Sequence, residues 1–496
     1  MNRKFTLPVE IKMVTATLVS AGFEAYVVGG SVRDLVLGKE PTDYDLTTNA
    51  TPEEIIALFP KTFYENTFGT VGVITCGEEL GTVCSRESVK IVEVTPFRTE
   101  GRYDDGRRPN SVSWAKTLTE DLERRDFAIN AMAYDSVKEE LIDMYKGQEN
   151  LKDKLVKTVG NADDRFQEDA LRLMRAVRFC VQLDFDLDPV TRESIERHAH
   201  LIKRVSFERI RDEFSKILMS DFPMRGIILL SETGLLQYIV PELEKGKGVM
   251  QNQAHKYDVW EHNLRTVQHS ADKKWPLFIR LSALFHDVSK PETKRFSQEK
   301  NVITFYGHDV VGGRVTREIL TRLKYPKEII EDVTLLVRWH MFFSDTEKIS
   351  ISAVRRMIAN VGKDMIWELM NLRICDRVGT GRPKEEPYRF RAYQAMVEQA
   401  LQDPVTLKMM KIDGKRIMDV TQETPGPKIG FILHALFQEV IDNPEKNTEE
   451  YLDRQALHMK SLPLGELKKL ADAGKEEMFE KNEEIVQGIK KQFHVK

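Results

Sequence analysis

The sequence is short of cysteine, of long apolar runs and of net charge, and each shortage excludes a class of protein. Its four cysteines form no CxxC pair and no dense framework, which argues against a disulfide scaffold and fits a reducing compartment. No run of about 18 apolar residues occurs, so no membrane-spanning helix is expected. Glu10 and Lys12 interrupt the apolar core that a signal peptide would need. We therefore expect a cytoplasmic protein with no membrane partner.

The small net charge excludes a globally basic nucleic-acid binder. The chain of 496 residues has 74 Lys and Arg against 78 Asp and Glu, a net charge of -4. Any contact with nucleic acid must therefore come from local arginine or lysine patches, or from metal ions that bridge to phosphate. Hydrophobic residues make up 41%, which excludes wholesale disorder, and the length corresponds to about three or four domains.

The apolar pattern changes near residue 150. Before it, short runs rich in β-branched residues at 25–28, 71–75 and 89–95 alternate with helical spacing. After it, apolar residues recur at helical spacing, with a helix pair at 223–240 broken near Gly234, and strand signals almost disappear. The sequence predicts a multidomain α+β protein in which a mixed-sheet head is followed by all-α domains.

A first group of polar residues lies where a predicted strand ends. Two glycines, the second being Gly30, precede Ser31 and a helix, so backbone amides and the helix N-terminus can hold an anion there. Ser31 and Arg33 can add phosphate contacts. Asp43 and Asp45 follow, two apart on a predicted strand, where both carboxylates would face the same side and suit Mg²⁺. Each motif alone is equally a glycine turn or a solvated acidic strand end; together they indicate a triphosphate cradle beside a two-metal site.

Two further motifs combine arginine with carboxylates. The segment 122–131 is charged at its start and apolar at its end, which is typical of a helix with a buried tail. Asp169 and Arg172 lie three apart at a predicted helix start, so they can share a face. They form either an ordinary surface ion pair, or an acceptor beside a donor fork that can hydrogen-bond the Watson–Crick edge of a base. The spacing leaves both interpretations open.

Taken in order, these motifs resemble those of the bacterial class II tRNA nucleotidyltransferases, the CCA-adding enzymes. The matching segments are GGSVRD, DYDL, RRDFAINAMAYD, EDALRLMRAVRF and SFERIRDE, within about residues 20–215, and DVTQETPGPKIGFILHAL at 419–436. The resemblance makes Asp43 and Asp45 the catalytic residues and the ligands of the catalytic metals. The nucleotide-binding residues expected from spacing and resemblance together are Gly30, Ser31, Arg33, Arg125, Asp126, Asp169, Arg172, Arg175 and Arg178.

The resemblance also implies which part of the nucleotide each of these residues contacts. It implies that Arg125 and Asp126 contact the ribose. Asp169 and Arg172 would form the protein template that reads first C and then A, with segment 204–213 as the supporting neck helix. Arg175 and Arg178 would lie on the phosphates or nearby.

The implied reaction is attack of the tRNA 3′-hydroxyl on the α-phosphate of CTP or ATP, with Mg²⁺ at the head and without a nucleic-acid template. Residues 68–71 lack the basic segment of poly(A) polymerases, and the loop at 104–109 resembles that of enzymes that add all three nucleotides. Enzymes that add only A or only CC, a mainly phosphohydrolytic enzyme and a non-catalytic RNA-binding relative remain alternatives. The expected partners are tRNA, CTP and ATP, with the protein a monomer or homodimer.

A third group is an ordered run of histidines and aspartates. Its members are His262, His286, Asp287, His308, His340 and Asp376. Mixed imidazole and carboxylate ligands suit Mn, Fe, Ni, Co or Zn better than Mg. The order resembles the HD superfamily of metal-dependent phosphohydrolases. That resemblance implies four core ligands (His262, His286, Asp287 and Asp376) and a second metal site completed by His308 and His340. An HD fold that has lost its activity is the alternative.

Four domains are expected from these motifs. They are a nucleotidyltransferase head at 1–150, a helical neck with the nucleotide template at 151–222, an HD domain at 223–388, and a helical C-terminal tRNA-binding region at 389–496.

Overall fold

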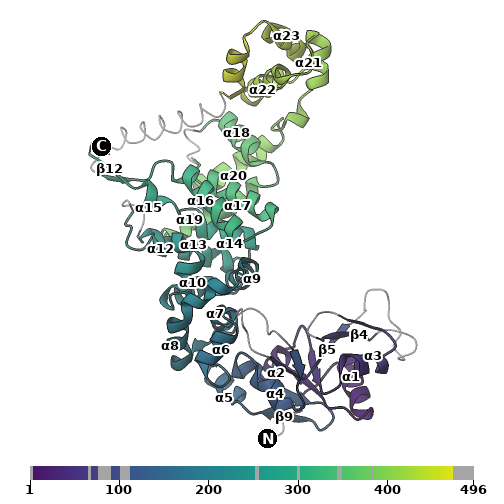
Figure 1. The fold of residues 1–496 in the computed structure, drawn as a ribbon. Coiled ribbons are helices and arrows are strands. Elements are labelled where there is room, and N and C mark those ends of the chain that lie inside the picture. The colour runs from purple at the N-terminus through teal and green to yellow at the C-terminus, as the bar shows by residue number, and fades with distance from the viewer. Residues whose placement is uncertain are drawn as a thin grey trace. The chain divides into compact units, whose positions relative to one another are not determined.

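The computed structural model describes residues 4–64, 69–75, 91–100, 112–251, 256–298, 302–342, 349–382 and 384–472. By packing, the chain divides into two compact units, Met1–Pro241 and Glu242–Lys496 (Figure 1). The finer boundaries after residues 150, 222 and 388 stay predictions. Within the described ranges, no helix combines the length and the apolar character needed to cross a membrane.

The first unit is built on a mixed seven-stranded sheet with the order β3-β4-β5-β2-β1-β8-β9. Its strands are β1 (Ala25–Val28), β2 (Asp45–Thr48), β3 (Thr62–Tyr64), β4 (Val71–Ile74), β5 (Ile91–Pro96), β8 (Met132–Asp135) and β9 (Glu140–Asp143). β2 and β5 run parallel and the other neighbours run antiparallel, which confirms the predicted mixed sheet. All four residues of β1 are buried, because this central strand is covered on both faces.

Short helices accompany this sheet. They are α1 (Val9–Ser20), α2 (Gly30–Val36), α3 (Pro52–Leu58), α4 (Leu118–Glu123) and α5 (Gly147–Lys152). α1 packs on β1 and β5, and α2 packs on β1 and β8. A separate antiparallel hairpin joins β6 (Arg98–Glu100) to β7 (Val112–Trp114).

Beyond the sheet, the first unit is helical. Its remaining helices are α6 (Ala162–Glu168), α7 (Leu171–Leu183), α8 (Pro189–His198), α9 (Phe207–Leu218), α10 (Pro223–Glu232) and α11 (Leu236–Ile239). The predicted break near Gly234 is confirmed, since this glycine has a φ of 72° between α10 and α11. α7 packs against α9 and α10 with most of its residues buried. A two-stranded parallel sheet of β10 (Leu155–Val156) and β11 (Asp186–Leu187) was not predicted, because two residues per strand leave no periodicity to detect.

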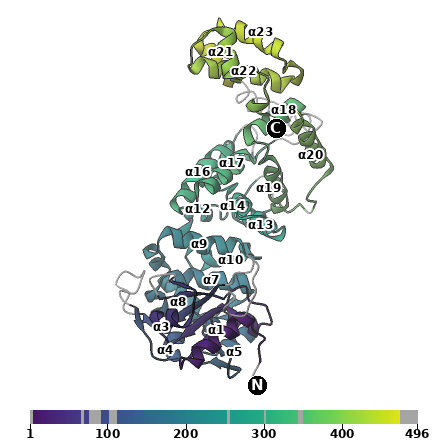
Figure 2. The ribbon, with the colours of Figure 1, turned by 90° about the vertical axis from the view of Figure 1, so that its right-hand side faces the viewer.

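The second unit is almost entirely helical. Its helices are α12 (Pro241–Glu244, which begins at the boundary), α13 (Val259–Asp272), α14 (Leu277–Phe285), α15 (Lys290–Thr293), α16 (His308–Arg322), α17 (Lys327–Trp339), α18 (Ile351–Val361), α19 (Ile366–Gly379), α20 (Tyr388–Leu401), α21 (Gly414–Thr421), α22 (Pro427–Asp442) and α23 (Glu449–Lys460). One antiparallel hairpin, β12 (Arg295–Ser297) with β13 (Val302–Thr304), interrupts them. α21, α22 and α23 gather around an apolar core of their own (Figure 2).

The close packing of α13 on α19 depends on one glycine. A Cβ atom on Gly379 would lie 2.1 Å from Oγ1 of Thr266 and 3.1 Å from the carbonyl oxygen of His262. Because no side chain separates the two helices here, Asp376 on α19 comes within 3.3 Å of His262 on α13.

Candidate active sites

The turn after β1 brings a cation and a carboxylate together. Gly29 has a φ of 76°, which favours glycine, and α2 begins directly after it. A Cβ atom on Gly29 would lie 3.2 Å from Nη1 of Arg125 and 3.5 Å from Oδ2 of Asp45, and one on Gly30 would lie 3.5 Å from Nη2 of Arg33. The two glycines therefore leave the space into which these three side chains face.

A cavity of about 740 Å³ opens over this turn. Its charged lining residues are Arg33, Asp45, Arg98, Arg124, Arg125, Asp126, Asp169, Arg172, Arg175, Arg178, Arg209 and Lys216. Positive charges thus outnumber carboxylates in a concave site, which favours a polyanionic ligand such as a nucleoside triphosphate. Of the residues expected to bind nucleotide, the cavity includes all except Ser31, which is buried and donates a hydrogen bond to the Val28 carbonyl (2.8 Å).

The two acidic residues of the DYD motif are placed differently from each other. Both side chains are exposed, but β2 begins at Asp45, so Asp43 lies before the strand and is not part of the cavity lining. Partial desolvation by the surrounding protein raises the pKa of Asp45, Arg125 opposes that rise, and the negative charge of Asp43 adds to it. Two acidic groups close enough to interact in this way fit a divalent cation with oxygen ligands.

Arg125 and Asp126 are each held by a partner. The buried carboxylate of Asp121 binds Arg125 (3.2 Å) and Arg124 (2.6 Å); burial alone would raise the pKa of Asp121, but the two arginines outweigh it and lower the value. Asp126 accepts from Nε of Arg175 (2.7 Å), and its pKa is likewise lowered despite burial, mainly by this arginine. Both residues therefore stay charged at the cavity wall.

Three guanidinium groups surround one aromatic ring. The carbon atoms Cζ of Arg178, Arg175 and Arg33 lie 4.3, 5.4 and 5.7 Å from the ring centre of Phe179. Arg178 is buried and binds Glu213 at 2.8 Å; burial first, and then the like charge of Arg175, lower the pKa of Arg178 to about 10. Cation–π contacts keep these like charges together on one wall of the cavity.

Asp169 and Arg172 lie at the junction of α6 and α7. Asp169 has an extended backbone between the two helices, and its Oδ1 accepts from the Leu171 amide (3.0 Å). Its carboxylate pairs with Arg209 of α9 at 2.7 Å, while Arg172 pairs with Glu168 at 2.5 Å. The pair is thus not an exposed i,i+3 ion pair. Each member has its own partner, and both line the cavity.

Arg209 and Asn130 are among the residues that line this cavity without having been expected to do so. Arg209 lies in the SFERIRDE segment, whose resemblance pointed only to a supporting helix. Asn130 accepts from Nη1 of Arg33 (2.9 Å) and donates to Asp126 (3.4 Å). The loop at 104–109 and Phe68, which bear on the subtype, lie outside the described residues.

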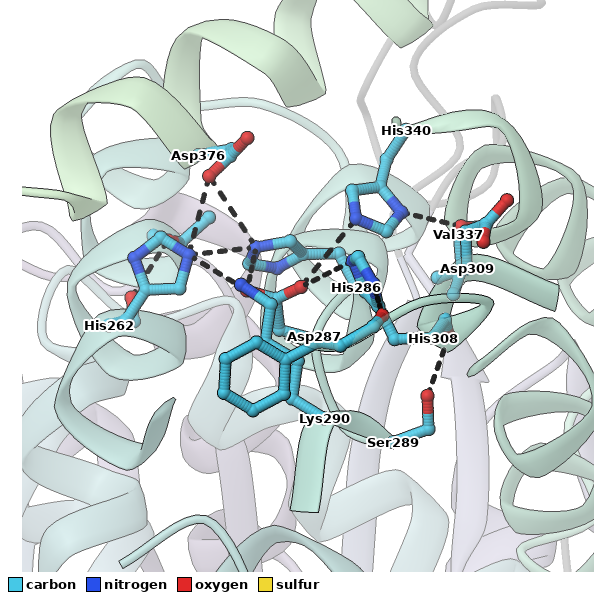
Figure 3. Close-up of polar contacts among 12 residues, drawn as sticks. His262, His286, Asp287, Ser289, Lys290, His308, Asp309, Val337, His340 and Asp376 are labelled. Atoms are coloured by element: carbon cyan, nitrogen blue, oxygen red, sulfur yellow. Dashed lines mark hydrogen bonds and ion pairs between the residues drawn. The ribbon is translucent and has the colours of Figure 1, made fainter. Parts of the chain in front are cut away.

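The expected histidine–aspartate cluster is assembled in the second unit. Its six members come from α13, the residues just after α14, the start of α16, the residue after α17, and α19. Their ligand atoms form two groups, and within each group all the ligand atoms lie within 4.8 Å of one another. One group is His262, His286 and Asp376; the other is Asp287, His308 and His340. In Figure 3, His262 and Asp376 lie on one side of Asp287, and His308 and His340 lie on the other.

One carboxylate oxygen of Asp287 contacts the two histidines of the first group, and the other contacts the two histidines of its own group. Its Oδ2 lies 3.2 Å from Nε2 of His262 and 3.3 Å from Nε2 of His286. Its Oδ1 lies 3.3 Å from Nε2 of His308 and 3.6 Å from Nε2 of His340. Asp287 would therefore contribute an oxygen to each group if both held a metal ion.

Unsatisfied buried atoms in the second group fit a metal. Oδ1 of Asp287 and the Nε2 atoms of His308 and His340 are buried and form no hydrogen bond with any residue that the structure describes. Buried polar atoms are normally satisfied, so three that converge on one point indicate an ion with nitrogen and oxygen ligands. Burial lowers the pKa of His286, but the carboxylates of Asp287 and Asp376 outweigh it and raise the value to about 9.

Lys290 belongs to the same cluster, although the sequence motif did not single it out. Its Nζ lies 2.5 Å from Oδ2 of Asp287, three residues earlier, and 2.6 Å from Oε1 of Gln251. The i,i+3 spacing was the signal that could have identified it. On the opposite side, Arg373 binds Asp376 at 2.6 Å.

Three family models match the chain in order. "Poly A polymerase head domain" covers residues 25–157 and "Probable RNA and SrmB- binding site of polymerase A" covers 184–247. A model for tRNA nucleotidyltransferase domain 2 covers 296–456, which includes His308, His340 and Asp376.

Two relatives match over most of their length. A CCA-adding enzyme of Bacillus cereus is 31% identical over 438 residues, 88% of this chain and 95% of that protein. One of Geobacillus thermodenitrificans is 32% identical over 436 residues, with 86% and 91% covered. The solved structure of the Bacillus stearothermophilus CCA-adding enzyme in complex with CTP has a TM-score of 0.66 and 27% identity, and the match covers 91% of this chain and 98% of that one. Together with the arginine-lined cavity beside Asp45, these matches show that the chain belongs to the CCA-adding enzyme family of tRNA nucleotidyltransferases.

Proposed function

We propose that the first unit adds C, C and A to the 3′ end of tRNA from CTP and ATP, without a nucleic-acid template. The observation that carries this proposal is the single cavity that combines Asp45, the arginine wall around Phe179 and the Asp169–Arg172 pair. Nucleotidyl transfer requires one region that binds phosphates, one that holds the reacting hydroxyl and one that binds the base. The alternatives of A-only or CC-only addition are not favoured by the family matches.

The family implies a divalent metal, and Asp43 and Asp45 are the residues that would hold it. We infer that the ion is Mg²⁺, which when bound neutralises charge on the triphosphate and on the attacking oxygen. Arg33, Arg175 and Arg178 bind the phosphates. Charge neutralisation and in-line positioning of the tRNA 3′-hydroxyl against the α-phosphorus then allow the new P–O bond to form as pyrophosphate leaves.

Base selection falls to Asp169 and Arg172. A carboxylate that only accepts, beside a guanidinium that only donates, is complementary to bases that present an amino donor next to an acceptor, as cytosine and adenine do. Guanine and uracil present a donor where these bases present an acceptor. We infer that Arg125 and Asp126, near the glycine turn, contact the ribose.

The test is addition of nucleotides to three tRNA transcripts, ending before the first C, after both C residues, or complete. Wild-type protein should extend the first transcript with CTP and then ATP, extend the second with ATP alone, and leave the third unchanged. Extension of the second transcript with ATP, together with no extension of the first by CTP, would replace the proposal with A-only addition.

We further propose that the histidine–aspartate cluster hydrolyses phosphate esters. The bridging position of Asp287 between two ligand groups supports this second function. Hydrolysis adds one water across a P–O bond: the water oxygen joins phosphorus, and the leaving alcohol takes a proton. Imidazole and carboxylate ligands suit Mn, Fe, Ni, Co or Zn, whose charge lowers the pKa of bound water.

The second function has its own assay. Metal-stripped protein, supplied with each ion in turn, is incubated with bis(p-nitrophenyl) phosphate, and bound metal is measured by elemental analysis. His286→Ala with Asp287→Ala should abolish turnover and metal retention and spare CCA addition. No turnover and no bound metal with any ion would leave the cluster without catalytic function.

A further inference from the structure

Positive side chains gather at the end of α19, next to the metal-ligand candidate Asp376. Arg373 and Arg377 lie three residues before and one residue after it, and the spacing of 373, 376, 377 and 380 puts them on one helix face. Arg382 follows five residues after Arg377, beyond the turn at Gly381, whose φ is 90°. Lys256 joins them, because its backbone amide donates to the Thr380 carbonyl (3.3 Å). We call Lys256, Arg373, Arg377 and Arg382 the arginine rim.

The rim carries more positive charge than its surroundings neutralise. Among the residues that the structure describes, Arg373 binds Asp376, whereas Arg377, Arg382 and Lys256 form no ion pair with a carboxylate. The nearby acidic group of Glu385 is already held by Lys273 at 2.7 Å. Arg382 and Lys256 are exposed. A basic residue in the last turn of a helix is favourable to the helix dipole, but this accounts for Arg377 alone and not for Lys256 or Arg382 beyond the helix.

We propose that the arginine rim binds the phosphodiester chain of a single-stranded oligonucleotide whose reacting phosphate lies at the histidine–aspartate cluster. Guanidinium and ammonium groups along one edge match successive backbone phosphates, which bind by charge and without sequence preference. A small phosphate ester at the cluster has no further backbone phosphates to offer to the outer residues of the rim, Lys256 and Arg382. This inference rests on the proposed second function, and it makes the preferred substrate of that site a nucleic-acid strand.

The experiment compares two substrates of one site. The full chain, loaded with the ion that best supports hydrolysis, is assayed with bis(p-nitrophenyl) phosphate and with a six-nucleotide RNA bearing a 3′-phosphate ester. Arg377→Gln with Arg382→Gln should lower the ratio of the two kcat/KM values, RNA over small ester, by about tenfold. Two lost contacts should also reduce the slope of log Kd for the RNA against log salt by about 1.4.

Two further variants make the result specific. Arg382→Lys in the Arg377 wild-type background keeps the charge and should leave the ratio near that of wild type, whereas Arg382→Gln should lower it. Lys327→Gln, at an 88% exposed side chain of α17, removes one positive charge far along the sequence and should change neither substrate.

Each remaining outcome supports or refutes the proposal that the rim binds RNA. An unchanged ratio of the two kcat/KM values in the double variant would refute it. A rise in the KM for tRNA during CCA addition that matches the loss on RNA would also overturn it, because the rim would then be a tRNA-docking surface. If wild type hydrolyses neither substrate, the second function fails by itself. RNA binding measured by fluorescence anisotropy then decides the rim, and equal Kd values for wild type and double variant refute it.

Discussion

Replacing Gly379 by alanine should open the contact between α13 and α19 and disturb the histidine–aspartate cluster. The new Cβ atom would lie 2.1 Å from Oγ1 of Thr266, whereas ordinary contacts begin at 3.4 Å, so about 1.3 Å must be recovered. Thr266 is fully buried, and its hydroxyl donates to the His262 carbonyl (2.7 Å), so rotating it away breaks a hydrogen bond. The helices must otherwise separate, which moves Asp376 away from His262.

The size of the effect follows from overpacking. A methyl group forced into a filled interior costs about 1–3 kcal/mol, which for a unit of this size lowers the unfolding midpoint by roughly 2–10 °C. Thermal unfolding followed by circular dichroism measures this loss. Metal retained after gel filtration, measured by elemental analysis, should fall in the same variant because His262 and Asp376 no longer converge.

A matched control variant should change the stability in the opposite direction. Gly430 lies within α22, and a Cβ atom there would have no neighbour within 4 Å, so Gly430→Ala should stabilise the protein by about 0.5–1 kcal/mol. Thr266→Ala removes the clashing oxygen and should make Gly379→Ala less costly in the double variant than in the single one. Equal midpoints for Gly379→Ala and wild type, with metal retained, would refute the packing argument.

Three shorter predictions concern the head. Asp43→Ala or Asp45→Ala should abolish nucleotide addition, measured on the transcript that lacks CCA, while the unfolding midpoint stays near wild type; addition by either variant near the wild-type rate would contradict the assignment. Arg209→Gln frees the Asp169 carboxylate and should raise misincorporation of UTP and GTP more than it lowers CTP addition, since a lost base contact costs about 1–3 kcal/mol of discrimination; unchanged selectivity would make Arg209 structural only. The pKa of Asp126 is lower in the folded protein than in the unfolded chain, so this carboxylate contributes stability above about pH 4 and loses that contribution as the pH falls further. The urea unfolding midpoint of Asp126→Asn should therefore vary less than that of wild type between about pH 5 and 3.

Much of the fold could be predicted from residue patterns because its strands and helices are long enough to show a period. The β-branched runs at 25–28 and 71–75 lie in the central sheet, and the helix break at Gly234 is where a glycine with positive φ interrupts the apolar repeat. β10 and β11 have two residues each, so no alternation exists to be recognised. Both strands pack against α7, so residues far apart in the sequence meet there.

In the candidate sites, too, contacts between residues close in sequence could be predicted and contacts between distant residues could not. Spacing in the chain brought Asp169 and Arg172 to notice and also allows the pair of Arg172 with Glu168, four residues earlier. It could not show that Arg209 pairs with Asp169, because these two residues are 40 positions apart. Asp43 shows a local limit, since the expected shared strand face depended on a strand that begins only at Asp45. Lys290 needed no tertiary information, because its three-residue separation from Asp287 already allowed an ion pair within one turn.

The donor chemistry sets different requirements for metal binding at the two proposed sites. In the head, Asp45 lies in a cavity lined by arginines, so an ion held there would depend on triphosphate oxygens for further ligands, as suits Mg²⁺, which keeps its waters and shares substrate phosphates. In the second unit, four imidazoles and two carboxylates converge without a substrate, and three of their atoms are buried and form no hydrogen bond with any described residue. Leaving such groups without an ion is costly, so the cluster would retain a bound metal between turnovers. On the proposed functions, removal of the ion from one site would therefore not by itself empty the other.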